Sequence, residues 1–145
     1  MTCLMIDIEG FDLKSEDIRR IKHPLVGGII LFARNFSDRS QLSELILAIR
    51  EIRNGLVISV DHEGGRVQRF RESFTLLPDM GLIGKNYNHD KSQAIIIANL
   101  TGWIIAKELG ELGIDFSFTP VLDIDYGTSS VIGNRSFHQN VDPII

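Results

Sequence analysis

Acidic and basic side chains that could bind a polar ligand stand together in residues 60–70, Val-Asp-His-Glu-Gly-Gly-Arg-Val-Gln-Arg-Phe. This segment follows a short, β-branched apolar run at residues 56–60, which predicts a strand buried on both faces. Buried parallel strands present functional side chains at their carboxyl ends, and Asp61 stands at that point. Its carboxylate can accept hydrogen bonds from two hydroxyl groups at once, as in a sugar diol. The structural alternative for Asp61 is a helix cap or an ion pair with a nearby arginine.

Two arginines of the same segment, Arg66 and Arg69, add donors to this region. The guanidinium group presents a rigid fork of donors that suits carboxylates and polar ligands. We expect one of the two to pair with Glu63 and shape the loop, and the other to face the site. Side-chain chemistry leaves open which arginine does which, and a solvated arginine is the alternative for either.

A second polar loop, at residues 132–138, contains Arg135 and follows the last predicted strand. Because parallel strands bring their carboxyl ends to one edge of a sheet, Arg135 can converge with Asp61 and Arg69 on one ligand. The alternative is a salt bridge from Arg135 to an aspartate of its own loop region, Asp123 or Asp125.

Several other chemistries lack support in the sequence. Gly64-Gly65 is more typical of a turn than of a phosphate cradle, since neither G-x-x-x-x-G-K-[ST] nor G-x-G-x-x-G is present. His62 cannot serve one site with Asp61, because neighbours on an extended chain point to opposite sides. The histidines do not show metal-ligand spacing and Cys3 has no credible base, so we expect no metal, no cofactor and no serine or cysteine nucleophile.

The composition is that of an ordinary globular domain. The chain has 145 residues, 43% of them hydrophobic, and a net charge of −4, which argues against binding nucleic acid. The single cysteine excludes an internal disulfide and suits a reducing compartment. Met1 begins a segment without a basic region or long apolar core, so we expect no signal peptide, no membrane association and a cytoplasmic location.

The remaining chain predicts an alternation of strands and helices. Strands are expected near residues 3–8, 27–32, 56–60 and 114–124, and helices begin near three capping residues, Ser15, Asp38 and Asp90. A loop of unusual length is expected from Asp61 to Asn88. This order predicts an α/β fold with parallel strands and right-handed crossovers, in one domain that spans residues 1–145. Periodicity leaves open whether the sheet is doubly wound or part of a closed barrel.

The segment at residues 60–70 closely resembles the signature of family 3 glycoside hydrolases, specifically the bacterial β-N-acetylglucosaminidases of peptidoglycan recycling. Further segments of the chain resemble the same family in the same order: residues 23–28, 30–32, 118–123 and 133–137. The resemblance implies a (β/α)8 barrel that removes terminal N-acetylglucosamine from muropeptides with retention. It also implies that Asp61, Arg69 and Arg135 bind the sugar, whereas Glu63 and Arg66 match the family but are assigned to shaping the loop.

The resemblance implies that this chain contains no catalytic residue of its own. The family's acid/base histidine follows the fifth strand and its nucleophilic aspartate follows the seventh, and neither segment is present in the sequence. A retaining mechanism needs both groups, so the 145-residue chain alone is expected to be inactive. A full barrel takes about 250 residues, so we expect the first four strands, a half-barrel.

A half-barrel leaves two open sheet edges and an uncovered apolar layer, which favours self-association. Two other functions are compatible with the sequence. One is a non-catalytic half-barrel that binds amino sugars, or an inactive truncated fragment. The other is an open α/β sheet that binds a phosphorylated ligand at Gly64-Gly65.

Overall fold

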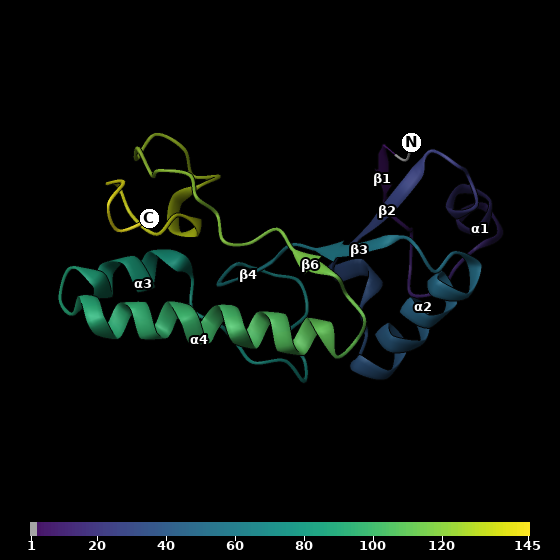
Figure 1. The fold of residues 1–145 in the computed structure, drawn as a ribbon, viewed down its shortest axis with the longest axis horizontal. Helices are drawn as coiled ribbons and strands as arrows, with labels where there is room; N and C mark the ends of the chain where they lie inside the picture. Colours follow the sequence, from purple (N-terminus) through teal and green to yellow (C-terminus); the bar gives the residue numbers. More distant parts are fainter. Residues whose placement is uncertain (1–2) are drawn as a thin grey trace.

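The computed structural model describes residues 3–145. The start of the N-terminal segment for which no signal peptide was expected, at Met1, lies outside the described residues. One sheet contains β1 (Leu4–Ile6), β2 (Val26–Leu31), β3 (Val57–Val60) and β6 (Phe116–Ser117), and a hairpin contains β4 (His62–Gly64) and β5 (Val67–Gln68). The α-helices are α1 (Ser15–Ile21), α2 (Arg39–Ile52), α3 (Met80–Tyr87) and α4 (Lys91–Gly110), and short 3-10 helices are η1 (Ala33–Asn35) and η2 (Gly133–Arg135). Figure 1 shows the sheet beside α1 and α2, with α3, α4 and the C-terminal segment extending to the opposite end.

The four strands of the main sheet are parallel and lie in the order β1-β2-β3-β6. Leu31 is opposite Val60, and Ser59 is opposite Phe116, so β3 is flanked on both sides. This arrangement confirms the predicted α/β alternation and brings the carboxyl ends of all four strands to one edge. The loop with Asp61 therefore begins at the centre of that edge.

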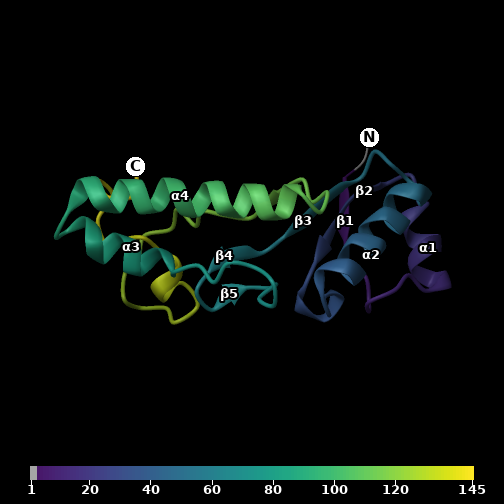
Figure 2. The same cartoon turned by 90° about the horizontal axis from the view of Figure 1, so that it is seen from below.

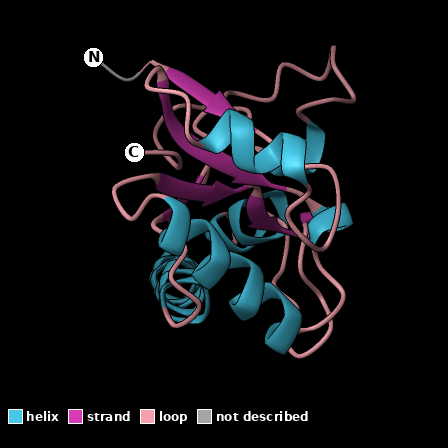
Figure 3. Ribbon diagram, turned by 90° about the vertical axis from the view of Figure 1, so that its right-hand side faces the viewer, coloured by secondary structure: helices cyan, strands magenta, loops and turns pink. Residues whose placement is uncertain are grey.

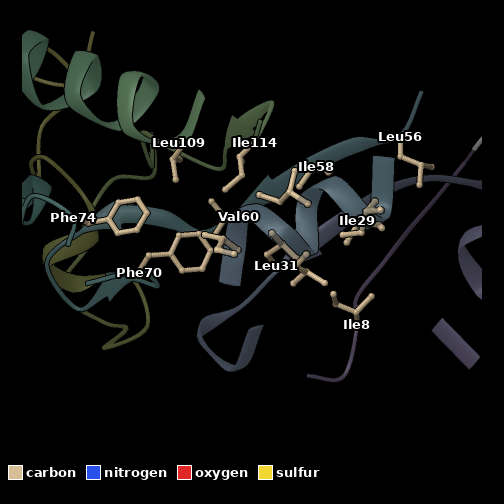
Figure 4. Packing of buried hydrophobic residues seen from close by; sticks show 14 of the residues in the cluster. Ile8, Ile29, Leu31, Leu56, Ile58, Val60, Phe70, Phe74, Leu109 and Ile114 are labelled. Atoms are coloured by element: carbon tan, nitrogen blue, oxygen red, sulfur yellow. The ribbon is translucent and has the colours of Figure 1, made fainter. Parts of the chain in front are cut away.

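Helices cover one face of the sheet, as Figure 3 shows from the side. The predicted apolar face of α2 is buried against the sheet, with Leu42, Leu45, Ile46 and Ile49 all at most 3% exposed. From the other end of the sheet, Leu109 of α4 packs into the same core (Figure 4). Burial of apolar side chains at helical spacing is what stabilises helices of this length in a protein.

The other face of the sheet is largely uncovered. Met5, Val57 and Phe116 are 42%, 40% and 40% exposed, and Val57 stands between the buried core residues Leu56 and Ile58. Side chains of neighbouring parallel strands in register lie on the same face, so these residues form one apolar layer. The uncovered layer predicted for a half-barrel is present.

Two of the three predicted helix caps are confirmed. The Asp38 carboxylate accepts a hydrogen bond from the Gln41 N–H at 2.9 Å, and the Asp90 carboxylate accepts one from the Gln93 N–H at 3.0 Å. The prediction for Ser15 was wrong, because α1 is capped one residue earlier, at Lys14. There the Lys14 N–H donates to the buried Asp17 carboxylate at 3.0 Å, which satisfies the helix start without Ser15.

The predicted loop from Asp61 to Asn88 was wrong in part, because it contains the β4–β5 hairpin and α3. Strands β4 and β5 are too short and too polar to show the alternation of apolar and polar residues that predicts a strand. Helix α3 contains two glycines, which weaken helix propensity, but its start carries a local signal in Asp79. The Asp79 carboxylate accepts a hydrogen bond from the Leu82 N–H at 2.8 Å, and Met80 and Ile83 supply a buried face.

The fourth strand is shorter than the predicted residues 114–124, since β6 covers only Phe116–Ser117. Backbone hydrogen bonds from Asp115 to Ile58 and from Phe118 to Val60 extend its pairing by a residue on each side. Beyond them, Pro120 has no N–H to give to a ladder, and the chain leaves the sheet. Among the described helices, including the 20-residue α4, none is both long and apolar enough to cross a membrane.

Candidate substrate-binding site

Asp61 lies between β3 and β4, at the carboxyl end of the central strand, as predicted. Its carboxylate accepts a hydrogen bond from an Arg69 Nη at 3.2 Å, and the two side chains are 25% and 31% exposed. The β4–β5 hairpin pairs His62 with Gln68 and so returns the chain to place Arg69 beside Asp61. The ion pair and the ligand-binding reading of Asp61 are compatible, because a carboxylate has further acceptor sites on its two oxygens.

The ends of β1 and β2 bring additional polar side chains to the same edge. Arg34, in η1, pairs with the Asp7 carboxylate, and its guanidinium carbon lies 4.6 Å from the centroid of the Phe32 ring. The guanidinium carbon of Arg69 lies 6.0 Å from the same centroid. The sequence reasoning missed this second acid–arginine pair, because the first strand was predicted to continue through Asp7, whereas β1 ends at Ile6. The available signal was Arg34, which closely follows the predicted strand at residues 27–32.

Arg135, in η2, forms a bidentate ion pair with Glu63 of β4. Its Nε and Nη2 donate to the two carboxylate oxygens at 2.9 and 2.7 Å. The hydrogen bonds to Glu63 raise the pKa of Arg135, burial opposes this, and the negative charges of Glu63, Asp61 and Asp123 add to the rise. Asp61 therefore lies within electrostatic reach of Arg135.

These contacts correct the predicted pairing of Glu63 and rule out the alternative pairing given for Arg135. Neither Arg66 nor Arg69 is the partner of Glu63, and Arg135 is not bonded to an aspartate of its own loop. Arg66 instead donates to the carbonyl oxygens of Ser130 and Val131 at 3.1 and 2.5 Å, so it joins the two loops. Loop-to-loop contacts of this kind depend on how the sheet and α3 pack, which neither segment reveals alone.

His62 points away from Asp61, as the alternation along an extended chain predicted. It is 1% exposed, and its ring centroid lies 5.7 Å from that of Phe70 and 5.6 Å from that of Phe74. Figure 4 shows these two phenylalanines beside Val60 in the core. Burial lowers the pKa of His62 to about 4, with Glu108 opposing and Arg71 reinforcing the shift, so the ring is neutral near pH 7.

The Gly64-Gly65 turn is packed against other backbone. Both residues have positive φ, at 99° and 54°, and a Cβ on them would lie 2.3 Å from the Pro78 carbonyl oxygen and 2.6 Å from the Asp79 Cβ. The Gly65 N–H donates to the Leu77 carbonyl at 3.0 Å, so it is not free for a phosphate. The turn reading therefore accounts for both glycines. Across residues 3–145, three or more His, Cys, Asp or Glu side chains do not gather in any arrangement that could hold a metal ion.

Carboxylates and arginines clustered at the carboxyl ends of parallel strands occupy the place where α/β-barrel enzymes carry their functional residues. Comparison with known proteins gives the family: residues 4–144 match the Glycosyl hydrolase family 3 N terminal domain, and the chain belongs to this family.

Individual relatives agree with this assignment. The chain is 58% identical over 136 residues to a beta-hexosaminidase of Methylobacillus flagellatus, and 53% identical over 139 residues to one of Bordetella pertussis. These matches cover 93% and 94% of this chain but only 39% and 40% of the relatives.

Solved structures are similar over the same region. NagZ from Neisseria gonorrhoeae, solved in complex with N-trifluoroacetyl-D-glucosamine, superposes with a TM-score of 0.96 at 48% identity, covering 99% of this chain and 43% of that one. A family 3 β-N-acetylglucosaminidase from Paenibacillus superposes with a TM-score of 0.86 at 31% identity, and the match covers 97% of this chain and 27% of that one. The expected TIM-barrel class, of which this chain supplies four parallel strands, is confirmed.

Proposed function

We propose that this chain is the sugar-binding part of a β-N-acetylhexosaminidase that removes terminal N-acetylglucosamine from muropeptides in the cytoplasm, during peptidoglycan recycling. Asp61 accepts hydrogen bonds from sugar hydroxyls, and Arg69 and Arg135 donate to the same N-acetylglucosamine unit. The observation that carries this proposal is the partly exposed Asp61 carboxylate held by Arg69 at the carboxyl end of the central strand. It is supported by the family of the chain and by relatives named beta-hexosaminidase.

The reaction itself requires residues that lie outside these 145 positions. Retaining glycoside hydrolysis needs a general acid/base and a carboxylate nucleophile on opposite sides of the scissile bond. We assign Asp61, paired with Arg69, to sugar binding and Glu63, paired with Arg135, to shaping the site, and neither of them to these two catalytic roles. We propose that the chain alone binds the sugar without hydrolysing it.

Binding of N-acetylglucosamine to the 145-residue chain, followed by ligand-observed NMR, tests this function. Asp61→Asn keeps the side-chain shape and removes the charge, so we expect about tenfold or greater loss of affinity, the effect of one charge-assisted hydrogen bond. Glu51→Gln, an equal loss of charge on the exposed side of α2, is the matched control and should leave binding unchanged. Equal affinity of wild type and Asp61→Asn would contradict the proposal. Release of a fluorophore from a β-N-acetylglucosaminide would contradict the inactivity of the chain.

A further inference from the structure

We propose that Glu63 and the glycine face of α3, formed by Gly81 and Gly84, are positioning elements that hold Arg135 where it can bind the substrate. This inference rests on the proposed function and extends it to residues that do not touch the sugar. It concerns a contact between segments 72 residues apart, β4 and η2. Glu63 had been expected only to shape its own loop.

Glu63 fixes the plane of the Arg135 guanidinium. The glutamate is 2% exposed, and both of its oxygens accept hydrogen bonds from Arg135, which gives a bidentate geometry. Arg135 Nη1 also lies 3.3 Å from the Val131 carbonyl oxygen. A guanidinium has five N–H donors, so these contacts leave two for a ligand.

The β3–β4 segment holds both arginines through two carboxylates that are two residues apart, Asp61 and Glu63. The pairing of β4 with β5 is irregular between His62 and Gly64, so the direction of the Glu63 side chain is given by its contact with Arg135 and not by strand alternation. Asp61 holds Arg69 and Glu63 holds Arg135, while His62 between them anchors the segment in the aromatic core. The His62 N–H donates to the Ser117 hydroxyl of β6 at 2.9 Å, which fixes the segment further.

Helix α3 holds the other end of this contact. A Cβ on Gly84 would lie 1.5 Å from the Phe137 carbonyl oxygen, and one on Gly81 would lie 3.1 Å from the Asn134 Cα. The segment on both sides of Arg135 therefore rests directly on the helix backbone, and Figure 2 shows α3 beside the C-terminal coil. Any side chain at Gly84 must push this segment away and separate Arg135 from Glu63.

Two variants test the proposal through different contacts. Glu63→Gln removes the charge from the ion pair, and Gly84→Ala displaces the η2 segment. Gly102→Ala on α4 is the matched control for the second, because a Cβ there meets nothing within 4 Å. The first readout is the Arg135 Nε–H signal in ¹⁵N NMR, which the bidentate pair protects from exchange with water.

We expect both variants to lose the protected Arg135 signal and to bind N-acetylglucosamine about tenfold to a hundredfold more weakly, the loss caused by misaligning one charge-assisted hydrogen bond. Gly102→Ala should retain both properties. If Glu63 acts through Arg135, adding Glu63→Gln to Arg135→Gln should weaken binding no further. This double variant leaves no unpaired charge at the contact, so it remains informative if Glu63→Gln alone, which leaves the partly buried Arg135 unpaired, fails to fold.

Three results would overturn the inference. One is an unprotected Arg135 Nε–H in the wild-type chain. Another is sugar affinity unchanged in Glu63→Gln despite loss of the signal. The third is full additivity of the two substitutions. A wild-type chain that shows the protected signal but binds no N-acetylglucosamine would refute the proposed function, and with it the purpose assigned to Glu63, while leaving the ion pair established.

Discussion

The burial of His62 predicts a specific dependence of stability on pH. The imidazole is 1% exposed among Phe70 and Phe74, and its Nδ1 is buried without a hydrogen-bond partner among the described residues. Desolvation lowers its pKa from 6.5 to about 4 in the folded chain. In the unfolded chain the ring is exposed to water and titrates near 6.5.

The sign and size of the effect follow from these two pKa values. The folded state keeps His62 neutral, so its contribution to stability is fully present above pH 6.5 and is lost as the pH falls toward 4. At pH 5.0 the unfolded state has gained a proton that the folded state has not. Because pH 5.0 lies roughly 1.5 units below the unfolded pKa, and each unit corresponds to 1.36 kcal/mol, the free energy of unfolding falls by about 2 kcal/mol relative to pH 7.5.

Urea unfolding of wild type and His62→Leu, followed by circular dichroism at pH 7.5 and 5.0, measures this quantity. Carboxylates contribute equally to both proteins, so the difference between the two pH dependences isolates the histidine. We expect the wild type to lose about 2 kcal/mol more than His62→Leu between these pH values. His89→Gln removes an exposed histidine and should behave as the wild type. Identical pH dependence of wild type and His62→Leu would refute the assignment of a buried neutral imidazole.

Two further predictions concern the fold. Asp38→Ala removes the carboxylate that caps α2 and should lower the free energy of unfolding by about 1 kcal/mol in the same urea titration. Ser40→Ala, on the exposed first turn of α2, should change it little. Equal unfolding midpoints for the two variants would contradict the capping role of Asp38. The uncovered sheet layer with Val57 and Phe116, and the open edges at β1 and β6, should make the chain self-associate in sedimentation velocity at micromolar concentration. A monodisperse monomer would show that these surfaces do not pair.

Features governed by local periodicity were predictable from the sequence. The apolar face of α2 follows from side chains spaced three and four residues apart, and its start follows from the reach of Asp38 to the third N–H of the helix. The position of Asp61 at the end of a buried strand and the opposite orientation of His62 follow from the period of two along an extended chain. These relations involve neighbouring residues, so the tertiary structure cannot easily override them.

The partners of the arginines were decided only by the tertiary structure. The sequence favoured a local partner for Glu63, but the hairpin returns Arg69 to Asp61, and α3 carries η2 and Arg135 to Glu63 across 72 residues. That contact requires the glycine face of α3, in a segment whose pattern did not reveal a helix. An ion pair forms where packing places its charges, and packing between segments distant in sequence depends on the whole fold.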